Sequence, residues 1–258
     1  MEEDPAKGCV ACGWTLEQQE QYCYSSHVKL FYGASRRGVW SIGAQKKEVK
    51  TLDHILKYPD IPAPKLIRDW VDSDGRYFVL QERIKGKTLE QAWPTLSESQ
   101  KTAIADQVVQ VRKKLRSLTS ESIQTVDHGP CEPALLFPDR APHGLLENLK
   151  KRLPKCEPYV LTHCDLNLGN LIVRDGALVG ILDWEFAAYY PVWYEYVSAS
   201  WGWTEDDAEW KRLLQQRMEA HSDGHRDAKD FWMDLCQLRK FPNLDEKGQQ
   251  VLESLSAD

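Results

Sequence analysis

The polar segment His163–Asn170 constrains the fold of this 258-residue chain more than any other feature. It places one histidine, one aspartate and two asparagines in HCDLNLGN, directly before the apolar run LIV. Polar side chains at this density beside a β-strand need partners once the strand buries them. The segment therefore predicts a binding site for something polar.

The residues after this segment predict a β-hairpin. Two apolar stretches within 171–185 flank Asp175-Gly176, which is a typical hairpin turn. A tight hairpin brings the residue before its first strand next to the residue after its second strand, so Asn170 and Asp183 are expected to lie close together. An amide oxygen beside a carboxylate suits Mg²⁺, which takes its other ligands from water and phosphates.

Asp165 completes a pattern that phosphoryl transfer requires, because it can accept the proton of a hydroxyl group. The sequence H-x-D-x-x-x-x-N, followed by Asp183, matches the protein-kinase signature of a catalytic base and two metal ligands. Asp183-Trp184-Glu185 stands where kinases have D-F-G. The alternative is a loop whose Asp and Asn side chains only cap backbone groups.

At these residues the chain resembles the aminoglycoside phosphotransferase family, whose relatives include choline kinases, and in particular its fungal-type members. The segments LTHCDLNLGNLIV and ILDWEFAAYYPVWYEY carry the resemblance, which extends from about Gly38 to Leu252. It implies an α+β, two-lobed protein-kinase-like fold, ATP and Mg²⁺ as cofactors, and a hydroxyl of a small molecule as the phosphate acceptor. Position by position, it makes Asp165 the base and Asn170 and Asp183 the metal ligands.

The resemblance also implies a nucleotide site in the smaller lobe. The hinge that holds adenine would consist of Gln81, Glu82, Arg83 and Ile84. Glu48 is placed to hold a lysine that contacts the phosphates.

That lysine is not obvious, because Gly43 leads almost directly into the segment of Glu48, where relatives have a further strand. Three lysines could substitute, although each also fits a surface charge: Lys29, Lys46 and Lys47. No G-x-G-x-x-G is present, and the available glycines are Gly33, Gly38 and Gly43.

The missing strand lysine supports an alternative function, and the chain departs from the family pattern at two further places. Cys164 stands where family members usually have glycine, and the stretch between Asp139 and Lys150 is short. The alternative is a catalytically impaired pseudokinase that acts as a nucleotide-binding or scaffolding module. A third interpretation, a zinc hydrolase using His163 and Asp165, lacks a second histidine at ligand spacing.

The chain is expected to comprise a peripheral segment (1–26), a small and shortened β-rich lobe (27–86) and a helical lobe (87–258). The small lobe would contain strands at 27–33 and 38–43, two more within 65–84, and a helix at 46–58. Helices are expected in the larger lobe at 143–154, after the N-cap residues Ser97 and Thr204, and through Phe231–Leu238. Its only β segment would be 171–185.

The aromatic segment Tyr189–Tyr196, with Trp201 and Trp203, is expected in the core rather than in an acceptor pocket. The spacing Cys9-x-x-Cys12, with Cys23 and His27, is weak evidence for zinc because a second closely spaced pair is missing.

Composition excludes several functions. The net charge of −6 without a concentrated basic stretch argues against nucleic acid as a partner. No apolar run approaches the roughly 20 residues that cross a bilayer, and the first residues lack a signal-peptide core. The seven scattered cysteines fit reduced thiols, so we expect a cytoplasmic protein without a membrane partner. The acceptor and the oligomeric state cannot be predicted.

Overall fold

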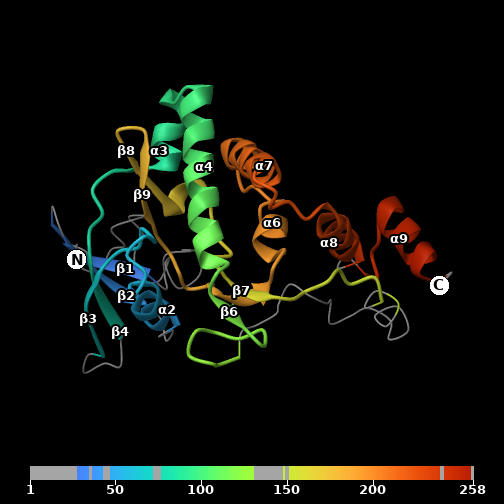
Figure 1. The fold of residues 1–258 in the computed structure, drawn as a ribbon, viewed down its shortest axis with the longest axis horizontal. Helices are drawn as coiled ribbons and strands as arrows, with labels where there is room; N and C mark the ends of the chain where they lie inside the picture. The colour runs from blue at the N-terminus through green and yellow to red at the C-terminus, as the bar shows by residue number, and fades with distance from the viewer. Residues whose placement is uncertain are drawn as a thin grey trace, which may run out of the picture. The chain divides into compact units, whose positions relative to one another are not determined.

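The computed structural model describes residues 28–34, 37–42, 47–71, 77–130, 148, 151–238 and 241–256 (Figure 1). The chain divides into two units. Unit 1 comprises Met1–Thr95 and Leu168–Phe186, and unit 2 comprises Leu96–Asn167 and Ala187–Asp258. The predicted peripheral segment and most of the helix expected at 143–154 lie outside the described residues. The domain boundaries after residues 26 and 86 stay predictions.

Unit 1 contains an antiparallel sheet in the order β1-β2-β4-β3. Its strands are β1 (Val28–Ala34), β2 (Arg37–Ile42), β3 (Leu66–Val71) and β4 (Tyr77–Glu82). Helix α2 (Lys47–Ile55) buries Val49, Leu52 and Ile55 along one face, and Val49 packs with Val79 of β4. The strands and the helix predicted for the small lobe are confirmed.

A second sheet of unit 1 contains the predicted hairpin. Its order is β5-β8-β9, with β5 (Lys87–Thr88), β8 (Leu171–Arg174) and β9 (Ala177–Ile181). Asp175 and Gly176 both have positive φ angles, 53° and 76°, as a two-residue hairpin turn of the mirror-image type requires. The described part of this unit also contains the short helices α3 (Leu89–Ala92), η3 (Trp93–Thr95) and η4 (Leu168–Asn170).

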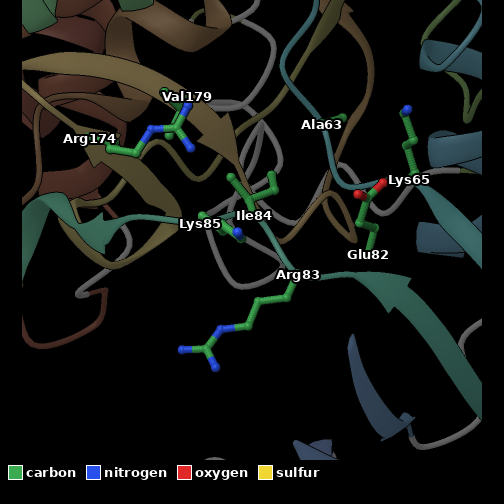
Figure 2. Close-up of a pocket in the computed structure, with 8 residues that line it drawn as sticks. All are labelled: Ala63, Lys65, Glu82, Arg83, Ile84, Lys85, Arg174 and Val179. Carbon is green, nitrogen blue, oxygen red and sulfur yellow. The ribbon is translucent and has the colours of Figure 1, made fainter. Parts of the chain in front are cut away.

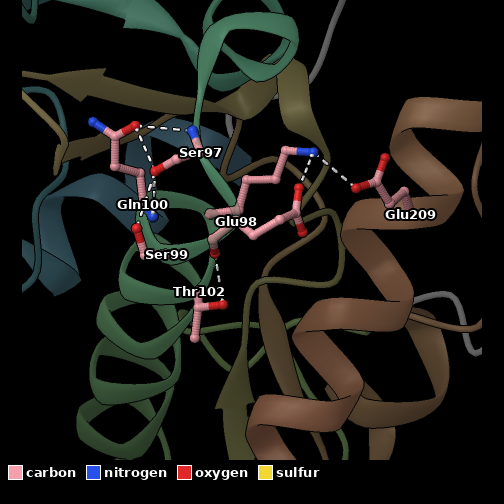
Figure 3. Close-up of polar contacts among 7 residues, drawn as sticks. Ser97, Glu98, Ser99, Gln100, Thr102 and Glu209 are labelled. Atoms are coloured by element: carbon pink, nitrogen blue, oxygen red, sulfur yellow. Dashed lines mark hydrogen bonds and ion pairs between the residues drawn. The ribbon is translucent and has the colours of Figure 1, made fainter.

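Two helices of unit 2 begin where their N-caps predict. Ser97 and Gln100 form a capping box at the start of α4 (Glu98–Leu115), as Figure 3 shows. Thr204 caps α7 (Glu205–Ala220) by accepting from the backbone N–H of Asp207 at 3.1 Å. Figure 1 shows α4 beside α7, and α8 beside α9. Among the described residues of this unit, the other helices are α6 (Tyr194–Ser198), α8 (Arg226–Leu238) and α9 (Glu246–Ser256).

Unit 2 also contains a sheet that the sequence analysis missed. It has the order β10-β7-β6, with β6 (Thr119–Ser120), β7 (Tyr159–Thr162) and β10 (Ala188–Pro191). The expectation that 171–185 is the only β segment after residue 87 is therefore wrong. These strands are too short to show a two-residue period, and their partners lie far apart in the sequence.

The aromatic segment belongs to the core of unit 2, as predicted. Its residues from Tyr189 to Val197 are buried, and the rings of Tyr190 and Tyr194 stack at 4.3 Å. Trp232 of α8 packs edge-on against Tyr194. Within the described part of the chain, no helix is long and apolar enough to span a bilayer.

Candidate active site

The hairpin positions the two predicted metal ligands. Leu171 pairs with Ile181, and the backbone N–H of Leu182 donates to the carbonyl oxygen of Asn170 at 2.8 Å. Asn170 therefore lies across from the residue that precedes Asp183. Asp183 itself has a φ of 62°, so the chain turns sharply where the second strand has ended.

The segment after Asp183 is anchored by a buried side chain. Trp184 is fully buried, and its indole N–H donates to the carbonyl oxygen of Ile181 at 2.8 Å. The backbone N–H of Trp184 donates to the carboxylate of Glu48 on α2. Trp184 is therefore a packing residue of unit 1.

Glu48 thus lies beside the Asp183-Trp184-Glu185 segment. Burial raises its pKa, and the charge of Glu185 raises it further. Hydrogen bonds from the Gln81 side chain and the Trp184 backbone oppose this rise. Gln81, which was predicted to be a hinge residue, therefore contacts Glu48.

The lysine predicted to pair with Glu48 is not located. In the described part of the chain, no lysine contributes to the pKa shift of Glu48. The side chains of the three suggested substitutes, Lys29, Lys46 and Lys47, lie outside the described residues.

The donor set at the hairpin fits Mg²⁺ bound together with a nucleotide. Mg²⁺ commonly uses one or two protein carboxylates plus phosphate and water oxygens. Within the described ranges, no group of three His, Cys, Asp or Glu side chains could hold a metal ion. A zinc site centred on His163 and Asp165 would need three or four such ligands, so the zinc-hydrolase interpretation finds no support there. Cys9, Cys12, Cys23 and His27 lie outside these ranges.

Three of the four predicted hinge residues border a pocket in unit 1. Figure 2 shows this pocket of about 440 Å³, lined by Ala63, Lys65, Glu82, Arg83, Ile84, Lys85, Arg174 and Val179. The Ile84 side chain packs so tightly on the hairpin that a Cβ at Gly180 would lie 2.5 Å from Ile84 Cδ1. The predicted hinge segment and the hairpin are therefore packed directly against each other.

The loop that carries Asp165 lies in unit 2 and is held by a glutamate. Glu195, on α6, is only 3% exposed. Its carboxylate accepts from the backbone N–H of His163 at 2.8 Å and from that of Cys164 at 3.2 Å. The backbone N–H of Asp165 donates to His163 Nδ1 at 3.2 Å, so this histidine helps to hold the loop backbone. The Asn167 side-chain amide donates to Asp165 Oδ1.

The sequence analysis missed Glu195. The available signal was an acidic residue inside an otherwise apolar aromatic segment, which must find partners once buried. Burial raises the pKa of Glu195 to about 7, although the two backbone N–H donors and the charge of Lys211 oppose this rise.

Stability should therefore depend on pH through Glu195. Its pKa in the folded state exceeds its usual value of 4.5, so its contribution is full below pH 4.5 and is lost as pH rises through about 7. Between pH 5 and pH 7, the free energy of unfolding of the wild type should fall by about 2 kcal/mol relative to Glu195→Gln. Urea unfolding of both proteins at both pH values measures this; a difference that stays constant or grows contradicts the assignment.

Cys164, which is predicted to replace a glycine of related proteins, has a backbone conformation that favours glycine. Its φ is 73°, in the left-handed region. Cys164→Gly should therefore keep the fold and change the free energy of unfolding by less than about 1 kcal/mol, because relief of strain offsets the flexibility of glycine. Cys164→Val should cost about 2 kcal/mol, since a β-branched residue fits this region poorly. Chemical denaturation compares the two variants, and equal stability would refute this view of the loop.

Asp165 borders a pocket of unit 2 of about 540 Å³. Its lining residues are Cys164, Asp165, Asn167, Ser198, Trp201, Gly202, Trp203, Lys211, Trp232 and Cys236. Trp201 is 55% exposed and Trp203 is 87% exposed. The expectation that these two tryptophans belong to the core is wrong: Gly202 between them approaches Ala208 of α7 too closely for a side chain, which holds this turn at the surface.

Comparison with solved structures identifies the fold as the α+β, two-lobed kinase-like fold. The chain is similar to a thermostable mutant of aminoglycoside phosphotransferase APH(4)-Ia in complex with AMP-PNP and hygromycin B, with 14% identity, 93% and 94% of the two chains covered and a TM-score of 0.56. It is also similar to the GDP complex of aminoglycoside 2'-phosphotransferase-IIIa, with 18% identity, 90% and 88% coverage and a TM-score of 0.54. The streptomycin-ATP-APH(2")-IIa ternary complex gives 14% identity, 90% and 91% coverage and a TM-score of 0.52.

The sequence places the chain in a family. Residues 34–231 match the model of the phosphotransferase enzyme family, APH, so the chain belongs to this family and the predicted resemblance is confirmed. No curated protein sequence matches the chain.

Proposed function

We propose that this protein is an ATP- and Mg²⁺-dependent phosphotransferase that acts on a hydroxyl group of a small molecule. The observation that carries the proposal is the hairpin of a chain that belongs to the phosphotransferase enzyme family. Asn170 directly precedes the first strand of this hairpin and Asp183 follows its second strand, so both lie at its open end. Similar solved structures contain ATP or AMP-PNP together with streptomycin or hygromycin B, which supports a nucleotide and a hydroxyl-bearing acceptor for this chain.

Each proposed site residue has one role. Asn170 and Asp183 would hold Mg²⁺, which neutralises charge on the nucleotide phosphates when bound. The backbone of Glu82, Arg83 and Ile84 would hold the adenine. Both assignments come from the sequence prediction. The pocket lined by Glu82, Arg83 and Ile84 supports the proposed adenine site.

Asp165 would orient the acceptor hydroxyl and take its proton. In the proposed reaction, a bond forms between the hydroxyl oxygen and the γ-phosphorus of ATP, and the bond from that phosphorus to the β,γ-bridging oxygen breaks, which releases ADP. The hydrogen bonds that the loop backbone donates to Glu195 support this role, because catalysis of this kind depends mainly on positioning.

A pseudokinase is the second candidate, and the surroundings of Glu48 favour it. In the described part of the chain this carboxylate interacts with Gln81 and the Trp184 backbone instead of a lysine. A site without a lysine on the phosphates would lose several orders of magnitude in rate and could still bind nucleotide.

Transfer of the labelled γ-phosphate of ATP separates the two candidates. The wild type is incubated with ATP and Mg²⁺ across amino alcohols, sugars, aminoglycosides and hydroxy acids, and calorimetry measures Mg²⁺-ATP binding in parallel. The proposal expects a phosphorylated product that depends on Mg²⁺. Binding of Mg²⁺-ATP without any transfer across the panel would favour the pseudokinase, and absence of both would reject the nucleotide site.

A further inference from the structure

Lys211 is a buried lysine that faces the same pocket as Asp165. It lies on α7 and is 4% exposed, yet it lines the pocket of about 540 Å³. None of the hydrogen bonds or ion pairs in the described part of the chain involves its ammonium group. Its partners within the protein are therefore charges at longer range.

The other buried lysine of unit 2 provides a contrast. Lys101 on α4 forms ion pairs with Glu98 at 3.0 Å and with Glu209 at 2.9 Å, drawn as dashed lines to these two glutamates in Figure 3. An ion pair of this kind compensates the cost of burying an ammonium group. Lys101 is thus satisfied by the protein, whereas Lys211 leaves its donors available to a molecule in the pocket.

The charges around Lys211 favour its protonated form. Burial lowers its pKa, while the nearby carboxylates of Asp207, Asp165 and Glu195 oppose that shift. These carboxylates favour the charged form without donating or accepting a hydrogen bond at Lys211. A ligand carboxylate would supply the missing hydrogen bonds, and charge-assisted bonds of this kind are among the strong ones.

The remaining walls of the pocket select for a flat apolar body. Trp201, Trp203 and Trp232 contribute indole rings, which pack well against flat apolar groups. Among its lining residues only Asp165 and Lys211 carry charge. A polycationic acceptor would need several carboxylates in the pocket wall. Asp165 supplies the single carboxylate among the lining residues, and it is assigned to the reacting hydroxyl.

We propose that the acceptor of this protein is a hydroxy acid with a flat apolar body, whose carboxylate binds Lys211 while its hydroxyl faces Asp165. The inference rests on the proposed function for the role of Asp165. The binding of the carboxylate by Lys211 stands on the pocket alone.

Three ligands that differ mainly in charge test the proposal without nucleotide. They share a para-hydroxyphenyl ring: para-hydroxyphenylacetate is anionic, its amide is neutral and tyramine is cationic. Tryptophan fluorescence of the wild type is titrated with each. The acid should bind about tenfold to a hundredfold more tightly than the amide, and tyramine should bind most weakly.

Variants assign the preference to Lys211. Lys211→Met should abolish the advantage of the acid over the amide, and Lys101→Met, the matched control, should retain it. The proposal is overturned if the wild type binds tyramine more tightly than the acid, or if it does not bind the acid at millimolar concentration. These two outcomes need only the wild type, so they hold even if a variant fails to fold. An unchanged preference in folded Lys211→Met also overturns it. Binding of the acid through Lys211 with no phosphate transfer to any acceptor would count against the proposed function alone.

Discussion

Asp165→Asn is expected to lower kcat for phosphate transfer by about 10²–10⁴-fold, because an amide cannot take the proton of the acceptor hydroxyl. Its oxygen can still accept from the Asn167 side chain, so the loop should keep its conformation. The affinity for Mg²⁺-ATP should stay within about twofold, since the substitution removes an interaction of the transition state. Steady-state kinetics and calorimetry measure the two quantities.

Asp175→Asn is the matched control for this substitution. Asp175 is exposed at the hairpin turn with a φ of 53°, and asparagine tolerates this conformation well. The control should keep wild-type kinetics. Turnover by Asp165→Asn at the wild-type rate would remove Asp165 from its proposed role, whatever the control shows.

Asp223→Ala is expected to cost about 3–5 kcal/mol in the free energy of unfolding, because it leaves a buried charge without its partner. Asp223 is 2% exposed and pairs with Arg112, which is equally buried, and with Arg116. Arg112 also donates to the carbonyl oxygen of Val192 at 3.2 Å, so the pair links α4 to the aromatic segment. Urea denaturation measures the loss.

Asp230→Ala on α8 is the control, because Asp230 is exposed. It should change the free energy of unfolding by no more than about 0.5 kcal/mol. If Asp223→Ala were as mild as this control, the buried ion pairs would not stabilise the fold as argued.

The sequence predicted the parts of this fold that local rules determine. The turn at Asp175-Gly176, the capping box at Ser97 and the cap at Thr204 are short-range signals that the structure confirms. The hairpin prediction also placed Asn170 beside the end of the second strand, because antiparallel pairing follows directly from a tight turn.

The sequence could not predict features that depend on long-range packing. The contact of Glu195 with the His163 backbone joins residues far apart in the chain, and no local pattern indicates it. Lys211 has the same helical spacing as the buried residues Leu214 and Met218, but a lysine is rarely buried, so its burial was not expected from the sequence. Trp201 and Trp203 were wrongly assigned to the core because they follow a buried aromatic segment closely in the sequence. Nearness in sequence to that segment does not determine their own burial.

Electron paramagnetic resonance of Mn²⁺, used in place of Mg²⁺ with AMP-PNP, tests most directly whether the hairpin holds the metal of a bound nucleotide. Asp183→Gly removes the carboxylate while accepting the φ of 62°, and Asn170→Ala removes the amide. The wild type should hold Mn²⁺ with the nucleotide, and each variant should lose at least about tenfold in Mn²⁺ affinity. Equal affinity in the wild type and both folded variants would contradict a metal site at this hairpin.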